Sequence, residues 1–273
     1  MKYPSQLLIP AYRLLMKLTS NRGLHTLARW DVALFNQERR VPIKAGSKLK
    51  LVLPPNEHFI GNLLGIHEEH IYAAVSESLQ PGGVYVDIGA NLGCFCVLAA
   101  DAVGPTGSIY AFEPNRDNFR LLQRNKQSIG KNAKMEAYKA GLSSKTGTAE
   151  LSIGPFSTYH SLEKKFEHGG TETVKITTLD HWAKAKNIER IDLMKIDVEG
   201  HELSVLAGAK KTLASGIVQA LVLECRDQFI RDAVPGLCKQ YGFLPYIWNG
   251  KHWVKNTAAT LGKDVLDCLM RRE

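Results

Sequence analysis

The sequence has few cysteines and no long apolar run, and both shortages exclude classes of protein. Five cysteines are scattered over 273 residues without a C-x-x-C pair. This excludes a disulfide framework and a cysteine zinc site. No stretch approaches the roughly 18 consecutive apolar residues of a membrane-spanning helix. We therefore expect a cytoplasmic protein with reduced thiols and one sizeable core.

Acidic residues are also outnumbered. The chain has 27 Asp and Glu against 35 Lys and Arg, which gives a net charge of +8. This excess favours anionic partners such as nucleotides, acidic glycans or membrane surfaces, without choosing among them. The hydrophobic fraction of 44% and the charged fraction of 23% are those of a globular protein, so a disordered or fibrous chain is excluded.

Residues 1–60 have weak periodicity and are interpreted as an N-terminal extension with one or two helices and a short strand at Leu49–Leu53. A basic amphipathic helix here can lie on an anionic membrane surface, which would make the protein peripheral to the membrane. The alternative, which we favour, is a helix packed on the main domain. The basic residues that would face lipid are Lys2, Arg13, Lys17, Arg22 and Arg29.

After this extension, short apolar runs alternate with amphipathic segments. Such alternation predicts an α/β fold with a mostly parallel sheet and helices on both faces. The expected strands are Val84–Ile88, Ile109–Phe112, Lys134–Tyr138, Ile191–Ile196 and Ala220–Glu224. The expected helices are Glu68–Leu79, Gly93–Val103, Arg116–Ile129, Leu179–Ala185 and His201–Leu213.

The α/β domain is predicted to cover residues 61–254, followed by a C-terminal amphipathic tail over 255–273. Within the tail, Leu261–Met270 suits a short amphipathic helix. Aromatic and β-branched residues at Phe243–Trp248 and Trp253–Val254 predict added edge strands. The irregular stretch Ser152–Thr173 is rich in Gly, Ser, His and Lys, so a binding loop is favoured there over a scaffold element.

The strongest motif is a glycine turn directly after the first expected strand. Gly89 permits a tight turn with bare backbone near a ligand, and Gly93 lets the next helix pack close to the sheet. The spacing is not the G-x-G-x-x-G that holds a dinucleotide pyrophosphate. Asp87, just before the turn, would repel a pyrophosphate but suits a ligand that carries an amino group.

A second acidic residue, Glu113, ends the next expected strand. A carboxylate at this position can accept hydrogen bonds from both ribose hydroxyls. Asn115 follows two residues later and is expected to cap the next helix. An amino group bound at Asp87 and a ribose bound at Glu113 together describe S-adenosylmethionine as the cofactor.

Four stretches of the chain resemble the FkbM-type methyltransferases, a family of S-adenosylmethionine-dependent O-methyltransferases. The resemblance runs in order from about Glu69 to Glu224. It implies a Rossmann-like seven-stranded sheet and methyl transfer to a hydroxyl of a sugar, glycolipid or polyketide lactone. The stretches are Val86–Gly93, Ala111–Asn115, Thr177–Asp180 and Ile191–Glu202.

We therefore expect a set of residues from these stretches to bind the cofactor. Glu69 is included because, in relatives, an acidic residue upstream of the glycine turn often contacts the amino acid end of the donor. The expected cofactor-binding residues are Glu69, Asp87, Gly89, Asn91, Gly93, Glu113 and Asn115.

The last of the four stretches is the expected catalytic centre. Alternation along a strand places Asp197 and Glu199 on the same side at its end. This pair can deprotonate the acceptor hydroxyl, position it, or hold a divalent cation, and all three alternatives stay open. His201, or His160 in the expected loop, can act as the base instead. Glu224, at the end of another strand, is expected to contact the substrate, as is His160.

The predicted function is therefore methyl transfer from S-adenosylmethionine to a hydroxyl of a sugar, glycolipid or related natural product. The expected partner is a small-molecule or glycan acceptor, with no nucleic acid and no dedicated metal site. The sequence carries no signal for a particular oligomeric state.

Three alternatives were considered. A nicotinamide-dependent short-chain dehydrogenase needs a Lys four residues after its Tyr, whereas Glu163 follows Tyr159 at that spacing. A nucleic-acid methyltransferase is suggested by the net charge, but Pro54–Asn56 has the wrong order for an N/D-P-P-aromatic motif. A non-catalytic scaffold at a membrane surface would not need both Asp87 and Glu113.

Overall fold

The computed structural model describes residues 39–42, 49–53, 68–154, 160–167, 169–258 and 260–272. The chain forms two compact units, Met1–Glu69 and His70–Glu273. In the first, β1 (Arg39–Pro42) pairs antiparallel with β2 (Lys50–Leu53), close to the strand expected at Leu49–Leu53. The helices expected before residue 39, with their lipid-facing basic residues, lie outside the described residues.

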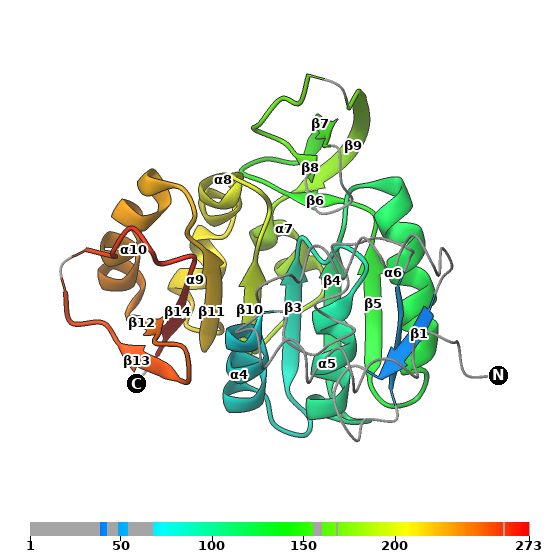
Figure 1. Cartoon of the computed structure of the whole chain (residues 1–273), viewed down its shortest axis with the longest axis horizontal. Coiled ribbons are helices and arrows are strands. Elements are labelled where there is room, and N and C mark those ends of the chain that lie inside the picture. Colours follow the sequence, from blue (N-terminus) through cyan, green and yellow to red (C-terminus); the bar gives the residue numbers. More distant parts are fainter. Residues whose placement is uncertain are drawn as a thin grey trace, which may run out of the picture. The chain divides into compact units, whose positions relative to one another are not determined.

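A mixed eight-stranded sheet forms the centre of the second unit (Figure 1). Its five strands from β11 to β5 are parallel to one another, and the other three pair antiparallel, with β14 next to β11. In spatial order the strands are β13 (Trp253–Lys255), β12 (Leu244–Trp248), β14 (Asp267–Arg271), β11 (Ala220–Glu224), β10 (Leu193–Ile196), β3 (Val84–Ile88), β4 (Ser108–Phe112) and β5 (Lys134–Tyr138).

The Rossmann-like α/β class is confirmed, but the expected count of seven strands is wrong. The sheet has eight because the C-terminal part of the chain contributes three antiparallel strands. The amphipathic helix expected over Leu261–Met270 is also wrong, since β14 lies there between β11 and β12. Cys268, Leu269 and Met270 are all buried, as a strand covered on both faces requires. Such a short apolar run does not distinguish a strand from a helix by periodicity.

Helices cover both faces of the sheet. On one face α5 (Cys94–Val103) packs on β3 and β4, and α6 (Arg116–Ile129) packs on α5 and β5. On the other face Trp182 of α7 (Leu179–Ala185) meets Phe112 edge-on, with ring centroids 5.2 Å apart. Strand alternation therefore sends Val86 and Ile88 to the α7 side, where they join the main core, and Asp87 to the α5 side.

Two helical segments differ from expectation. The single helix predicted over His201–Leu213 is two short helices, α8 (Glu202–Ala207) and α9 (Lys210–Ala214). The break is at Gly208, where an added Cβ would lie 2.0 Å from the carbonyl oxygen of Ser143. The sequence analysis did not anticipate α10 (Gln228–Tyr241), a long helix that contains a proline. The remaining described helix is α4 (Glu69–Ser78).

The two ends of the stretch predicted as a binding loop, and a short segment in its middle, belong to a second, small sheet. It has the order β6 (Gly141–Leu142), β9 (Thr171–Thr177), β7 (Gly147–Ile153) and β8 (His160–Ser161). β7 and β9 form an antiparallel hairpin around a cluster of Leu151, Val174 and Ile176. Figure 1 shows this sheet beyond the ends of the main-sheet strands, above β3 and β4. Among the described residues, no helix is long and apolar enough to cross a bilayer.

The placement of β14 inside the sheet predicts a difference between two nearby leucines. Leu269→Ala removes a side chain that is 0% exposed, which costs about 2–5 kcal/mol and lowers Tm by roughly 6–12 °C. Leu266→Ala, at a position 56% exposed, should change stability by less than about 0.5 kcal/mol. Equal Tm values for the two variants by differential scanning calorimetry would contradict the placement of β14.

Candidate functional site

Asp87, near the end of β3, is a buried carboxylate whose two oxygens differ in their contacts with the described residues. The side chain is buried, and Oδ2 accepts the Cys96 thiol hydrogen at 3.2 Å. Oδ1 is also buried and makes no hydrogen bond to a described residue. Burial raises the pKa of Asp87, and the Lys195 ammonium opposes that rise. A buried polar atom without a partner is rare and costly, so this oxygen is suited to a ligand amino group.

The glycine turn presses bare backbone against the end of β10. Gly89 has φ +82°, and an added Cβ would lie 1.8 Å from the carbonyl oxygen of Asp197. Gly93 has φ +86°, and its Cβ would lie 2.6 Å from Leu122 of α6. Asn91 is also left-handed, with φ 52°. A side chain at Gly89 would separate the turn from the segment that carries Asp197, and a side chain at Gly93 would separate it from α6.

Glu113 ties the glycine turn to the end of β4. Its Oε2 accepts the backbone N–H of Asn91 and its Oε1 accepts that of Asn115, both at 2.8 Å. Burial raises the pKa of Glu113 to about 7, and these two N–H groups oppose the rise. Asn115 accepts from the backbone N–H groups of Asp117 and Asn118, which confirms the predicted helix cap. Each Glu113 oxygen keeps a second lone pair for a ligand.

Three carboxylates converge beside this turn. Asp197 and Glu199 follow β10, Glu224 ends β11, and one oxygen of each lies within 4.8 Å of the others. Lys195 Nζ lies 2.8 Å from Asp197 Oδ2, and Arg226 Nε lies 2.6 Å from Glu224 Oε1. Two of the three carboxylates therefore already have a cationic side-chain partner.

The crowding of these carboxylates changes their acidity. Burial and the neighbouring Asp197 together raise the pKa of Glu199 to about 7. Burial and Asp197 also raise the pKa of Glu224. A carboxylate that exchanges its proton near neutral pH is suited to general-base work. Glu199 combines such a pKa with a side chain that is not fully buried.

One residue that shapes the turn after β10 was not predicted from the sequence. Glu202, at the start of α8, is 0% exposed, and its Oε1 accepts the backbone N–H groups of Val198 at 3.0 Å and Gly200 at 3.2 Å. The turn between them holds Glu199 at φ 54°, which is strained for a residue with a side chain. The signal for Glu202 was an acidic residue in the first turn of a helix, where backbone N–H groups are free.

The two histidines and Glu69 are less suited to chemistry at this cluster. His201 Nδ1 lies 2.7 Å from Glu163 Oε1 and its Nε2 lies 3.0 Å from Ser143 Oγ, so both ring nitrogens have protein partners. This arrangement favours a structural role over that of a base. His160, in β8, accepts a backbone N–H at 3.2 Å within the small sheet. Glu69 begins α4 and is exposed, and its contact with a cofactor stays a prediction.

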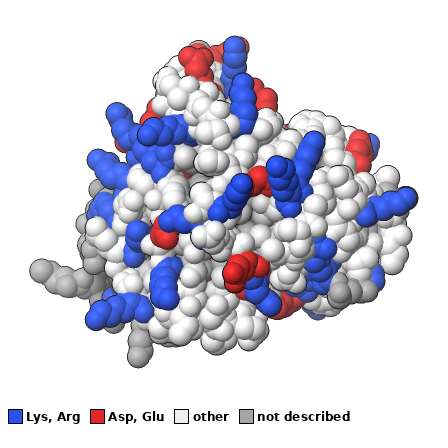
Figure 2. Space-filling model, turned by 180° about the vertical axis from the view of Figure 1, so that it is seen from behind, with Lys and Arg blue, Asp and Glu red and all other residues white. Residues whose placement is uncertain are grey.

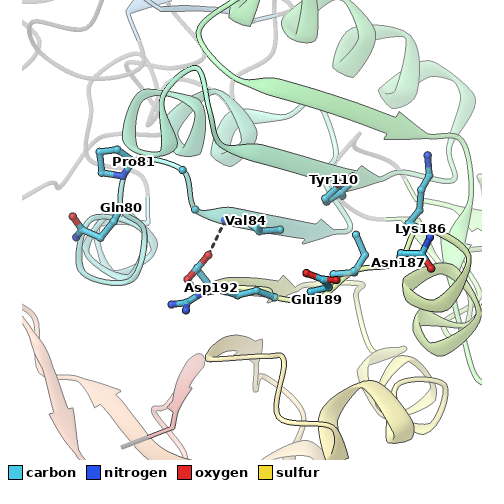
Figure 3. Close-up of a pocket in the computed structure, with 12 residues that line it drawn as sticks. Gln80, Pro81, Val84, Tyr110, Lys186, Asn187, Glu189 and Asp192 are labelled. Carbon is cyan, nitrogen blue, oxygen red and sulfur yellow. Dashed lines mark hydrogen bonds and ion pairs between the residues drawn. The ribbon is translucent and has the colours of Figure 1, made fainter.

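A separate cavity of about 550 Å³ lies at the other edge of the sheet, near the amino ends of β3 and β10 (Figure 3). No residue of the predicted site lines it. Asp192, on its wall, accepts the Val84 backbone N–H at 2.8 Å and pairs with Arg190 at 2.6 Å. This carboxylate therefore has a structural role at the start of β3. We place the functional site at the carboxyl edge instead.

Relatives of this chain include two curated methyltransferases. Hexuronic acid methyltransferase AglP of Haloferax volcanii is 30% identical over 152 residues, which are 54% of this chain and 59% of that protein. The 2-O-methyltransferase NoeI of Sinorhizobium fredii is 26% identical over 155 residues, which are 49% of this chain and 60% of that protein. The chain therefore spans less than two thirds of the length of either relative.

The chain is also similar to solved structures and to a family model. A SAM-dependent O-methyltransferase of Thermotoga maritima overlaps with a TM-score of 0.44 at 11% identity, covering 86% of this chain and 77% of that one. The model of the methyltransferase FkbM domain matches residues 87–243, from the carboxylate before the glycine turn to the end of α10. This match covers more than half of the chain, and the protein belongs to the FkbM methyltransferase family.

Proposed function

We propose that the protein transfers a methyl group from S-adenosylmethionine to a hydroxyl of a sugar or glycolipid. The observation that carries this proposal is that two pairs of carboxylates lie at one edge of the sheet. Asp87 and Glu113 lie around the glycine turn, and Asp197 and Glu199 lie on the segment whose carbonyl touches Gly89. One relative is named for a hexuronic acid and another for 2-O-methylation, which supports a sugar oxygen as the acceptor.

The residues around the glycine turn fit this cofactor. The unpartnered Oδ1 of Asp87 would accept the amino group, and the remaining lone pairs of Glu113 would accept the ribose hydroxyls. Asn91 and Asn115 belong to the same site because their backbone N–H groups orient Glu113. When bound, the cofactor supplies a methyl group on a positively charged sulfur, which a site rich in carboxylates favours.

At the acceptor side, Asp197 and Glu199 would hold the hydroxyl in line with the methyl group. Methyl transfer is a displacement, so positioning supplies much of the rate. The hydroxyl proton would pass to Glu199, whose pKa of about 7 allows it to be ionised at neutral pH. Asp197 already forms an ion pair with Lys195, and Glu224 forms one with Arg226. We therefore assign the cluster to proton transfer and substrate positioning rather than to a divalent cation.

The face of the molecule in Figure 2 does not favour nucleic acid as the acceptor. A nucleic-acid-binding surface gathers Lys and Arg along one face or groove. Figure 2 shows them spread over one face of the molecule, with acidic side chains among them. The net charge is compatible with an acidic glycan, which is the acceptor class that we propose.

Two isosteric substitutions should separate cofactor binding from chemistry. Asp87→Asn should weaken the affinity for S-adenosylhomocysteine by roughly 10- to 100-fold, because a charge-assisted hydrogen bond is lost. Asp197→Asn should keep that affinity within about threefold but lower methyl transfer by roughly 100-fold or more. Calorimetry measures binding, and release of S-adenosylhomocysteine over a panel of glycans and glycolipids measures turnover.

The matched control for this pair is Asp232→Asn, which removes an exposed carboxylate of α10. It should leave both binding and turnover unchanged. Normal turnover in the Asp197 variant would show that the catalytic centre is misplaced.

The affinity for S-adenosylhomocysteine should decrease as the pH is lowered from 8 to 6. Glu113, with a pKa of about 7, gains a proton as pH decreases through this range and then loses capacity to accept hydrogen bonds. The affinity should change by about tenfold per pH unit at most. Glu113→Gln should bind more weakly and lose this pH dependence, whereas Glu199→Gln should retain it. An affinity in the unmodified protein that does not vary with pH would rule out this role of Glu113.

A further inference from the structure

Lys195 is a charged residue in the middle of a buried strand. All four residues of β10, Leu193 to Ile196, are buried, and Lys195 is only 4% exposed. An ammonium group removed from water costs several kcal/mol unless anions or hydrogen bonds compensate it. The groups around Lys195 must therefore compensate the cost of burying its charge.

These groups lie on both sides of the proposed reaction. In the parallel register, Lys195 stands directly opposite Asp87 of β3. Its Nζ lies 2.8 Å from Asp197 Oδ2, two residues further along the chain. The same Nζ lies 5.2 Å from the ring centroid of Phe95 in α5, so an aromatic face covers the ammonium from above the sheet.

We propose that Lys195 is a positioning residue whose buried ammonium is the shared counter-charge of Asp87 and Asp197, and thereby joins the donor and acceptor sides of the site. This inference rests on the proposed function for the meaning of the two sides. One cation between two carboxylates holds both at a fixed separation, which an in-line transfer between them requires.

Other titratable groups also face these carboxylates. The Lys195 ammonium makes the largest contribution that opposes burial and lowers the pKa of Asp87, and the Cys96 thiol and the Tyr85 hydroxyl lower it as well. Around Asp87 the other groups are Tyr85 on β3, Asp197 after β10, Cys96 on α5 and Glu113 after β4. Around Asp197 they are Glu199, Glu202 and Glu224.

Without Lys195, the stability of the protein should depend on pH in a new way. Burial already raises the pKa of Asp87, and loss of the ammonium should raise it further. The ionised Asp87 would then destabilise the folded state above its pKa. The deficit should therefore be largest at high pH and shrink as pH falls and the carboxyl group becomes protonated.

The test compares Lys195→Met with the unmodified full chain. At pH 8 we expect Tm to fall by about 5 °C or more, and at pH 5.5 the difference should shrink by at least half. The affinity for S-adenosylhomocysteine at pH 8 should fall about tenfold or more. Lys195→Arg, which keeps the charge, should recover part of both losses.

The matched control is Lys186→Met. Lys186 also makes a 2.7 Å ion pair, with Glu136, but its side chain is 39% exposed. Its Tm difference from the unmodified protein should be small and should not vary with pH, and its affinity for S-adenosylhomocysteine should be unchanged.

The double variant Lys195→Met/Asp87→Asn keeps the test decisive if the single variant does not fold. Removing both charges should restore a Tm within a few degrees of that of Asp87→Asn alone. A pH-independent deficit in Lys195→Met, or a double variant as unstable as the single one, would overturn the inference. Failure of the unmodified protein to bind S-adenosylhomocysteine would instead overturn the proposed function, because the stability measurements need no ligand.

Discussion

The contact between the Gly89 backbone and the Asp197 carbonyl is the constraint on which the rest of the site depends. Two parallel strands end side by side, and the chain leaves both of them in tight turns. Because Gly89 has no side chain, the glycine turn and the segment that carries Asp197 can touch. Glu113 secures the first turn and Glu202 secures the second, each by accepting two backbone N–H groups. The site therefore consists of two neighbouring turns, each stabilised by a buried carboxylate.

Burial of carboxylates provides both the rigidity and the chemistry of this edge. Carboxylates that leave water are held by N–H groups, by Lys195 and by Arg226, and those with incomplete compensation have a raised pKa. The pKa of Glu113 and that of Glu199 are both raised to about 7, on opposite sides of the contact. The small sheet contacts the segment that carries Glu199, because the Ser161 hydroxyl donates to the Glu199 carbonyl at 2.8 Å. Donor binding and proton transfer should consequently both respond to pH in the neutral range.

Local patterns predicted the parallel core well, because each of its elements is specified by its own residues. Val84–Ile88, Lys134–Tyr138 and Ala220–Glu224 form as predicted, and Asn115 caps α6 as its position suggested. Elements that depend on distant partners were not predicted. β14 is a strand only because β11 and β12 flank it, and the small sheet exists only because β9 returns along β7.

The same distinction applies to the site. The motif residues Asp87, Glu113, Asp197 and Glu199 were visible in sequence, and the structure brings them to one edge. His201 also stands out in the motif, but its partners Ser143 and Glu163 are distant in sequence and occupy both ring nitrogens. The roles of Lys195 and Glu202 follow from burial and partners, although a lysine within an apolar strand was a signal that could have been read.

Thermal unfolding with a large excess of S-adenosylhomocysteine, beside a matched sample with NAD⁺, tests the central claim most directly. A ligand at about 100 times its Kd stabilises the folded state by roughly 2.7 kcal/mol, which corresponds to a shift of about 5–10 °C. The account predicts this shift with S-adenosylhomocysteine and none with NAD⁺. A shift with NAD⁺ alone would contradict the assignment of the glycine turn, and no shift with either would contradict cofactor binding at this edge.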